Sequence, residues 1–132
     1  MRVVIDTSLW IDYNRGAVNP EERARIEQLW REGRAILYQF VWLELVIGYR
    51  SPKEQRTLRD FRELSRWEAI TGEDGVKAET FARVLREQGH TVGASDLLIL
   101  AATDRLGAQI ANHDGDFDLA LKNPALAHLT WT

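Results

Sequence analysis

Short apolar runs alternate along the chain with longer segments in which apolar residues recur every three or four positions. Runs of the first kind predict buried strands, and segments of the second kind predict amphipathic helices. We expect strands at residues 3–6, 35–38, 67–70, 109–111 and 128–131. We expect helices at residues 8–14, 20–32, 40–49, 52–65, 73–87 and 95–106. This alternation predicts an α/β fold, an α/β/α sandwich with a central parallel sheet.

The same spacing predicts which side chains face the core. The helix at 40–49 is apolar along most of its length, which indicates a buried helix. Ser95 precedes an apolar stretch and is a candidate N-cap for the helix that follows. Two other helices should each bury one apolar face, made of Ile26, Leu29 and Trp30 in the first and of Val76, Phe81, Val84 and Leu85 in the second.

The composition fits a single domain over residues 1–132, because a chain of this length with 45% hydrophobic content supports one core. Cysteine is absent, in agreement with a reducing cytoplasm. Asp6 and Asp12 interrupt the apolar start too early for a signal peptide, and no run approaches the roughly 18 residues of a membrane span. We therefore expect a soluble, cytoplasmic protein that does not enter a membrane.

The net charge of −3 is not the strongly basic balance typical of nucleic-acid binders, but the charge is unevenly distributed. Residues 50–66 contain six basic and three acidic side chains, a local balance of +3, which leaves −6 for the remainder. Arg56 and Arg59 in this segment are candidates for binding RNA phosphates. The alternative is a solvated helix face, because basic residues three apart drift around a helix and the interspersed acids can pair with them.

Five carboxylates stand where the predicted strands end or the helices begin. They are Asp6 at the end of the first strand, Glu44 one turn into the helix after the second, Asp96 at the start of a later helix, and Asp114 and Asp116 after the strand at 109–111. The carboxyl ends of parallel strands and the adjoining helix starts lie at one edge of the sheet. We therefore expect these carboxylates to converge there.

Each carboxylate taken alone also has a structural explanation. Asp6 and Asp96 could cap the helices that follow, because Asp at a helix start accepts hydrogen bonds from free backbone N–H groups. Glu44 could be exposed on a half-buried helix, although a charge among apolar neighbours is costly to bury unless it is paired or binds metal. Asp114 and Asp116 could belong to an Asp-Gly turn.

Taken together, the carboxylates suggest a metal site. Oxygen ligands without Cys and without a His-x-x-x-His pair favour Mg²⁺, with Mn²⁺ as the alternative, over Zn²⁺. One such ion, or two about 4 Å apart, serves phosphodiester hydrolysis by activating water and stabilising charge on the departing oxygen. Gly48 lies one turn after Glu44 and leaves space on that helical face for another backbone or a ligand. His113 adjoins the acids and could touch substrate, although a surface or capping role is the simpler explanation.

Four segments of the chain resemble the four motifs of PIN-domain ribonucleases, and their order and spacing are most similar to those of VapC-type toxins. The segments are Asp6-Thr7-Ser8-Leu9-Trp10-Ile11-Asp12, Glu44-Leu45-Val46-Ile47-Gly48, Ser95-Asp96-Leu97-Leu98-Ile99-Leu100-Ala101-Ala102 and Asn112-His113-Asp114-Gly115-Asp116-Phe117. The resemblance implies a Mg²⁺- or Mn²⁺-dependent endoribonuclease, the toxin of a type II toxin–antitoxin system. Such toxins form homodimers and are held inactive by a VapB-type antitoxin. Antitoxin anchors are expected beside Trp42, Tyr49, Leu58 and Phe61.

The resemblance also implies roles for individual residues. The catalytic, metal-binding acids of the family correspond to Asp6, Glu44, Asp96 and Asp114, with Asp116 as a candidate fifth ligand. Thr7 matches the hydroxyl residue after the first acid, Ser8 is a second hydrogen-bonding candidate beside it, and Asn112 stands where the family often has Thr. Either Asp114 or Asp116 could be the fourth acid, and Asp114 is favoured because it comes first after the strand.

Two other classes of protein compete with this interpretation. A Mg²⁺-dependent phosphatase of the haloacid-dehalogenase type also places Asp after the first strand. It expects a second Asp where this chain has Ser8, and a catalytic Lys, whereas no Lys precedes Lys53. A catalytically silent PIN-like module that only binds RNA or protein should lack one of the acids, and none is missing.

Overall fold

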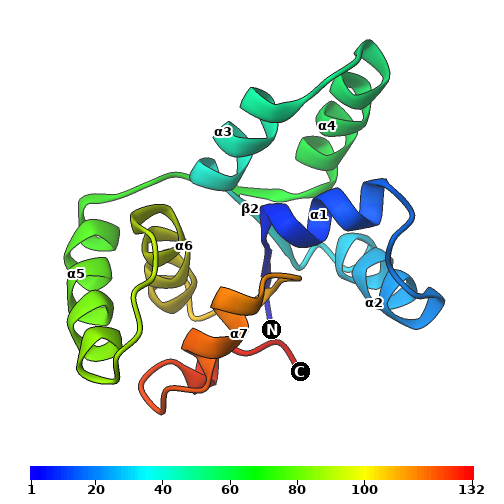
Figure 1. Ribbon diagram of the computed structural model, residues 1–132. Coiled ribbons are helices and arrows are strands. Elements are labelled where there is room, and N and C mark those ends of the chain that lie inside the picture. The colour runs from blue at the N-terminus through cyan, green and yellow to red at the C-terminus, as the bar shows by residue number, and fades with distance from the viewer.

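Four parallel strands form the sheet at the centre of the computed structural model, which describes residues 1–132 (Figure 1). The strands are β1 (Val3–Ile5), β2 (Ala35–Tyr38), β3 (Arg66–Glu68) and β4 (Gln109–Ala111), in the spatial order β3-β2-β1-β4. Val4 of β1 is aligned with Ile36 on one side and with Ile110 on the other. The two central strands are buried along their whole length, which explains their unbroken apolar sequence. The predicted parallel sheet is confirmed.

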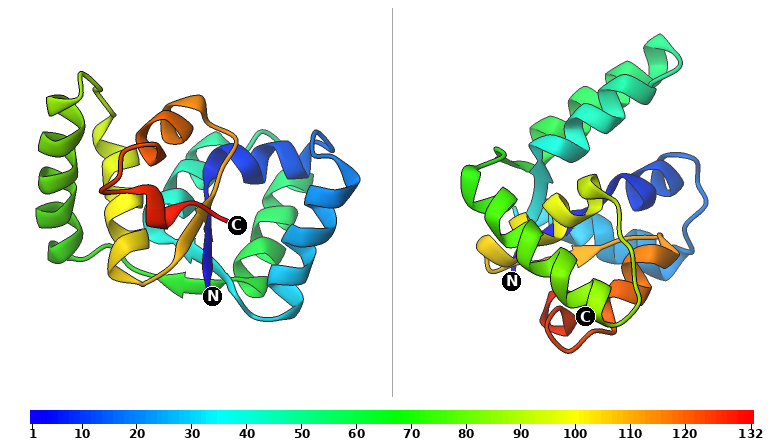
Figure 2. Two further views of the ribbon diagram at one scale, coloured as in Figure 1. Left: turned by 90° about the horizontal axis from the view of Figure 1, so that it is seen from below. Right: turned by 60° about the vertical axis from the view of Figure 1, so that its left-hand side comes forward.

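Helices cover both faces of this sheet. They are α1 (Thr7–Asn14), α2 (Pro20–Arg31), α3 (Gln39–Gly48), α4 (Pro52–Leu64), α5 (Gly72–Glu87), α6 (Ala94–Arg105) and α7 (Gly115–Leu121). α1 and α2 lie on one side of the sheet, and α5 and α6 lie on the other (Figures 1 and 2). The chain steps from β1 to β2 to β3 in one direction and returns to β4 in the other, so right-handed crossovers place the last pair of helices on the opposite face. No helix combines the length and the apolar character needed to cross a membrane.

Local sequence signals set the ends of several helices. Asn19 and Ser51 are the N-caps of α2 and α4, and each accepts a hydrogen bond from a backbone N–H of the first turn. A proline follows each cap at the first helical position. Gly33 and Gly107 end α2 and α6 with positive φ angles of 67° and 61°. This left-handed conformation favours glycine and turns the chain directly into β2 and β4.

An aromatic cluster packs α4 against the first two helices. Trp10 of α1 lies 5.4 Å from Phe61 of α4, measured between ring centroids. Trp30 of α2 packs edge-on against Phe61 at 5.7 Å and against Tyr13 at 5.0 Å. Such tilted and edge-to-face pairs stabilise beyond the area that they bury. The cluster therefore positions the base of the α3–α4 pair, whose far end extends beyond the rest of the molecule (Figure 2).

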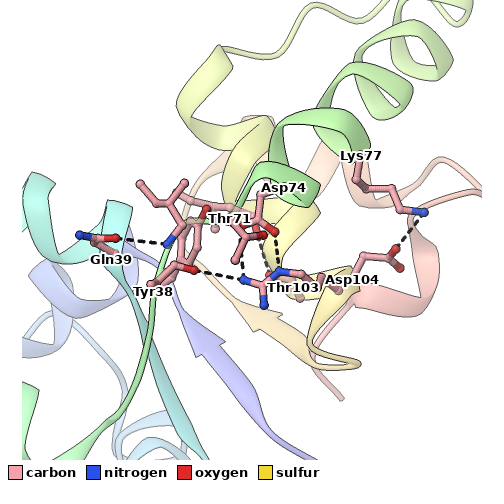
Figure 3. A network of polar contacts seen from close by, with 11 residues as sticks. Tyr38, Gln39, Thr71, Asp74, Lys77, Thr103 and Asp104 are labelled. Atoms are coloured by element: carbon pink, nitrogen blue, oxygen red, sulfur yellow. Dashed lines mark hydrogen bonds and ion pairs between the residues drawn. The ribbon is translucent and has the colours of Figure 1, made fainter.

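A buried polar network joins α5 and α6 to the end of β2 (Figure 3). The Asp74 carboxylate is fully buried and accepts hydrogen bonds from the Tyr38 hydroxyl at 2.9 Å, from Arg105 Nε at 2.6 Å and from the Thr71 backbone N–H at 3.0 Å. Arg105 also donates to the Ala69 carbonyl at 3.2 Å. Burial alone would raise the pKa of Asp74, but these hydrogen bonds and the Arg105 charge hold it below its usual range. The network fixes the first turn of α5 beside the last turn of α6.

Some predicted element boundaries are wrong. Residues 128–131 do not form a strand: Ala127–Leu129 is a short 3-10 helix, η1, and only Thr130 makes an isolated bridge, to Ile110. The predicted strand at 67–70 begins one residue earlier and ends at Glu68. No helix was predicted at α7, where the Asp114-Gly115 pair suggested a turn. The side chain of Asp114 instead caps that helix.

The predicted core positions are confirmed in α2 and are wrong in part elsewhere. Ile26 and Leu29 of α2 are buried, whereas Val76 of α5 is 70% exposed. The predicted buried helix at 40–49 is buried on one side only, because Ile47 of α3 is 83% exposed. Ser95 is not the N-cap of α6; that position is occupied by Gly93.

Candidate active site

Asp6 lies at the junction between β1 and α1. Its backbone N–H donates to the Ala111 carbonyl at 2.9 Å, which ties the residue to the end of β4. Its carboxylate accepts hydrogen bonds from the Ser8 backbone N–H at 3.1 Å and from the Ser8 hydroxyl at 2.6 Å. Asp6 is therefore the N-cap of α1, as one of its two interpretations held, and it is also a buried carboxylate at the carboxyl edge of the sheet.

Glu44 reaches this edge from α3. It is half-buried, and its Oε1 accepts a hydrogen bond of 3.0 Å from the Thr7 hydroxyl, which directly follows Asp6. The exposed position that was the alternative for Glu44 is therefore wrong. Thr7 and Ser8 both act as the supporting hydrogen-bond donors that were predicted, the first toward Glu44 and the second toward Asp6.

Asp96 is the third residue of α6 and lies among the other acids. It makes no side-chain capping hydrogen bond, so the capping interpretation of this residue is wrong. Burial, followed by the negative charges of Asp6, Asp114, Glu44 and Asp116, raises the pKa of Asp96 to about 6. The charges of all the other carboxylates that were predicted to converge thus act on Asp96.

Asp114 and Asp116 occupy the start of α7. The Asn112 side-chain oxygen accepts a hydrogen bond from the Asp114 backbone N–H at 2.9 Å, so Asn112 supports the loop as predicted. Asp114 Oδ1 accepts from the Asp116 backbone N–H at 2.8 Å. The charge of Asp114 acts on both Asp6 and Asp96 and has a larger effect on Asp96 than that of Asp116, which is exposed. The choice of Asp114 as the fourth acid stays a prediction.

The charges of these side chains are only partly offset within the protein. Burial, together with the charge of Asp114, raises the pKa of Asp6, although hydrogen bonds from Ser8 act in the opposite direction. Burial and the charge of Asp6 likewise raise the pKa of Glu44. No three of the carboxylates are close enough together to form a ready metal-binding group. Unneutralised carboxylates repel one another, which favours this separation and favours the binding of a cation among them.

Comparison with known proteins decides the family. A family model of the PIN domain matches residues 3–121. This chain belongs to the PIN domain family. Ribonuclease VapC11 of Mycobacterium tuberculosis is 28% identical to it over 123 residues, which cover 89% of this chain and 90% of that protein.

Solved structures share the fold of this PIN domain. VapBC2 from Rickettsia felis, bound to a DNA fragment from its promoter, contains a chain that matches with a TM-score of 0.77 at 17% identity, covering 100% of both chains. VapBC-1 from nontypeable Haemophilus influenzae matches with a TM-score of 0.76 at 18% identity, covering 100% of this chain and 97% of that one. The four-stranded parallel sheet flanked by helices is thus that of the VapC-like PIN domain.

His113 connects the active-site edge of this PIN domain to α1 and α2, which the sequence pattern did not indicate. Its backbone N–H donates to the Ser8 hydroxyl at 3.0 Å. Its ring nitrogens lie 2.8 Å from Asp12 Oδ2 and 2.6 Å from Glu22 Oε1. Burial would lower the pKa of His113, but the two carboxylates raise it above its usual range. Both ring nitrogens are therefore engaged by acids of the surrounding helices.

Arg56 and Arg59 lie on the outer face of α4. Both are exposed, beside Lys53, and neither pairs with Asp60 or with any other acid. The pairing expected for a solvated face is therefore absent. The structure does not bring these two arginines to the cavity beside Glu44, which α4 lines with other residues. Their role in RNA binding stays a prediction.

Proposed function

We propose that this PIN domain is a Mg²⁺- or Mn²⁺-dependent endoribonuclease that hydrolyses RNA phosphodiester bonds as the toxin of a toxin–antitoxin pair. The observation that carries the proposal is that Asp6, Glu44 and Asp114 lie at the same edge of the sheet as Asp96 and that, after burial, their charges raise the pKa of Asp96. Membership of the PIN domain family and similarity to proteins named VapC ribonucleases support it.

The residues present fit a hard divalent cation. All the candidate ligands are carboxylate oxygens, the type that Mg²⁺ and Mn²⁺ prefer. Asp6, Glu44, Asp96 and Asp114 would hold the ion, with Asp116 as the alternative for the fourth position. Glu44 uses only one carboxylate oxygen in its hydrogen bond to the protein, and Asp114 likewise uses one. The other oxygens are therefore free to bind a cation.

These contacts give the cation and the residues around it separate roles. When bound, a divalent cation activates water and stabilises the charge on the departing oxygen. Thr7 keeps Glu44 turned toward the site, and Ser8 does the same for Asp6. Because these hydroxyls are themselves held at the start of α1, the acids are oriented before substrate arrives. Without the cation the same carboxylates would repel an RNA phosphate, so cleavage should require it.

The proposal includes a small VapB-type antitoxin as partner, in a complex that contains a homodimer of this chain. Solved relatives of this fold are VapBC complexes. Two of the four residues that were expected to contact the antitoxin are wrong, because Leu58 and Phe61 are 2% and 3% exposed and pack inside the domain. Tyr49 is 43% exposed and is still a candidate anchor. A short reading frame for a DNA-binding protein should lie immediately upstream of the gene.

The activity is tested by incubating the protein with a mixed-sequence single-stranded RNA in Mn²⁺, in Mg²⁺ and in chelator, and measuring cleavage. Asp6→Asn should reduce cleavage to background without unfolding the protein, because Asn still caps α1. Glu87→Gln is the matched control: it removes an exposed carboxylate at the end of α5 and should cleave like the parent. Undiminished cleavage by Asp6→Asn, in a preparation free of host ribonuclease, would end the proposal.

The same assay separates the rival functions. RNA binding by the parent without cleavage under any metal condition would support a silent PIN-like module. Release of phosphate from a phosphate monoester, with RNA left intact, would support the phosphatase. Cleavage that persists in chelator would contradict the metal dependence and leave the nuclease in place.

A further inference from the structure

A cavity of about 200 Å³ opens beside Glu44, between α1, α3 and the start of α4. Its lining includes Trp10, Arg15, Glu44, Gly48, Tyr49 and Arg50. Glu44 thus forms part of the cavity wall and, through Thr7, is also joined to the acidic site. The volume is smaller than the roughly 300–1,000 Å³ of pockets that enclose drug-sized ligands, so the cavity suits one small unit of a longer molecule.

Two arginines, Arg15 and Arg50, line this cavity together with two glutamates, Glu44 and Glu54. Arg15 follows the last turn of α1, and Arg50 lies in the connection between α3 and α4. Neither forms an ion pair within the protein. Glu54 also lines the cavity, but its Oε2 accepts a 2.7 Å hydrogen bond from the Arg50 backbone N–H. The two guanidinium groups are therefore available to a phosphate from outside.

The cavity also has an aromatic side chain within reach of solvent. Tyr49 is 43% exposed, whereas Trp10 is 6% exposed and forms part of the apolar floor. Gly48 adds no side chain, and a Cβ built there would have no atom within 4 Å. The exposed ring of Tyr49 suits stacking with an unpaired nucleobase, and Gly48 leaves room for it. The unpaired arginines Arg15 and Arg50 suit the phosphate of the same nucleotide.

We propose that this cavity is a nucleotide subsite, which receives one unpaired nucleotide of the RNA adjacent to the bond that is cleaved. Its base would stack on Tyr49, and its phosphate would lie between Arg15 and Arg50. The proposal rests on the ribonuclease function and adds to it a place where one nucleotide is held. The nucleotide subsite places a phosphate contact near the acids on these two arginines, separate from the predicted contribution of Arg56 and Arg59 on the outer face of α4.

Binding measured without cleavage tests the nucleotide subsite directly. A fluorescently labelled, mixed-sequence single-stranded RNA of about 12 nucleotides is titrated with the protein in chelator; this length lies within the roughly 4–16 nucleotides that one single-strand-binding fold covers. Tyr49→Ala should weaken binding about fivefold or more, because stacking on the ring is lost. Arg50→Gln should weaken it and flatten its salt dependence by about one unit of slope. Arg86→Gln is the control, since Arg86 is an exposed arginine without an ion pair on α5, a helix that lies on the other side of the sheet from α1 (Figure 1).

A filling substitution provides a test that leaves the charge unchanged. Gly48 is the last residue of α3 and does not adopt a positive φ, so a larger side chain is free of backbone strain. Gly48→Leu should project into the cavity and weaken RNA binding at least as much as Tyr49→Ala. Its melting temperature should stay close to that of the parent, which excludes unfolding as the cause.

The outcomes separate this proposal from the ribonuclease function. If the parent cleaves RNA and Asp6→Asn does not, while Tyr49→Ala, Arg50→Gln and Gly48→Leu all bind like the parent, the nucleotide subsite is wrong and the nuclease stands. If Arg86→Gln lost as much RNA affinity as Arg50→Gln, the loss would come from the change in net charge, and the nucleotide subsite would be wrong. Loss of antitoxin binding with RNA binding unchanged would assign the cavity to a protein segment. Equal affinity for duplex and single-stranded RNA would contradict the unpaired nucleotide.

Discussion

Replacing Asp96 with Asn should stabilise the metal-free protein at neutral pH. Burial and four neighbouring carboxylates raise the pKa of Asp96 to about 6, and no capping hydrogen bond compensates. A carboxyl group whose pKa is raised by folding binds its proton more tightly in the folded state. The cost to folding is absent at a pH below the ordinary pKa of Asp, grows as the pH rises toward 6, and is complete above it.

The size of this cost follows from the pKa. A rise from the usual Asp value to about 6 is roughly two pKa units, or about 3 kcal/mol. Asp96 is only half-buried, so solvent screening reduces the cost to about 1–2 kcal/mol. Asn also loses a favourable charge in the first turn of α6, worth about 0.3–1 kcal/mol. The net gain of about 1 kcal/mol should raise the melting temperature by about 4 °C.

Thermal melts in chelator at about pH 7.5 and about pH 4 measure this effect. Asp96→Asn should melt above the parent at the higher pH and no longer do so at the lower pH, where Asp96 is protonated in the parent. Glu87→Gln, which removes an exposed carboxylate, should match the parent at both. Millimolar Mn²⁺ should then raise the melting temperature of the parent more than that of Asp96→Asn. A melting temperature of Asp96→Asn at or below the parent's in chelator at neutral pH would refute the electrostatic reasoning.

Three further results are expected. Asp74→Ala should destabilise the fold by about 3–5 kcal/mol, because it removes a fully buried carboxylate and leaves Tyr38 and the partly buried Arg105 without their shared acceptor. The parent should lose this contribution only as the pH falls below the usual range of Asp, since the pKa of Asp74 is lowered; denaturant titrations across pH would show it, and a loss below about 1 kcal/mol would contradict it. Charge reversal at Arg56 and Arg59 should weaken binding of unrelated RNAs alike and flatten its salt dependence, whereas a purely solvated face predicts equal salt slopes for variant and parent. Asp114→Asn should lose the stabilisation that Mn²⁺ gives the parent and Asp116→Asn should keep it; the reverse pattern in thermal melts would move the fourth ligand to Asp116.

The sheet and the acidic edge could be predicted because two simple rules act together. Unbroken apolar runs such as 35–38 mark strands that are buried on both faces. Parallel strands then bring their carboxyl ends to one edge, which places Asp6 and Asp114 together although they are far apart in the sequence. Neither rule requires knowledge of side-chain packing.

Contacts between surfaces of different helices could not be predicted in this way. Asp74 and Arg105 occupy ordinary polar positions in their own helices, and only the packing of α5 against α6 pairs them and buries Asp74. Arg15 likewise follows a helix end with no periodic signal, and its place beside Glu44 depends on how α3 crosses α1. The helix α7 was missed because an Asp-Gly pair is as typical of a turn as of a capped helix start.

The link between His113 and Ser8 has a consequence for variation among related sequences. Ser8 accepts the main-chain N–H of His113, so any residue except proline at position 113 can preserve this contact to the active-site edge. The imidazole is needed only by its two acidic neighbours, Asp12 and Glu22. Position 113 is therefore free to diverge without loss of the contact to Ser8. Where histidine is replaced, positions 12 and 22 should change with it, because two carboxylates facing each other without a cation would push α1 and α2 apart.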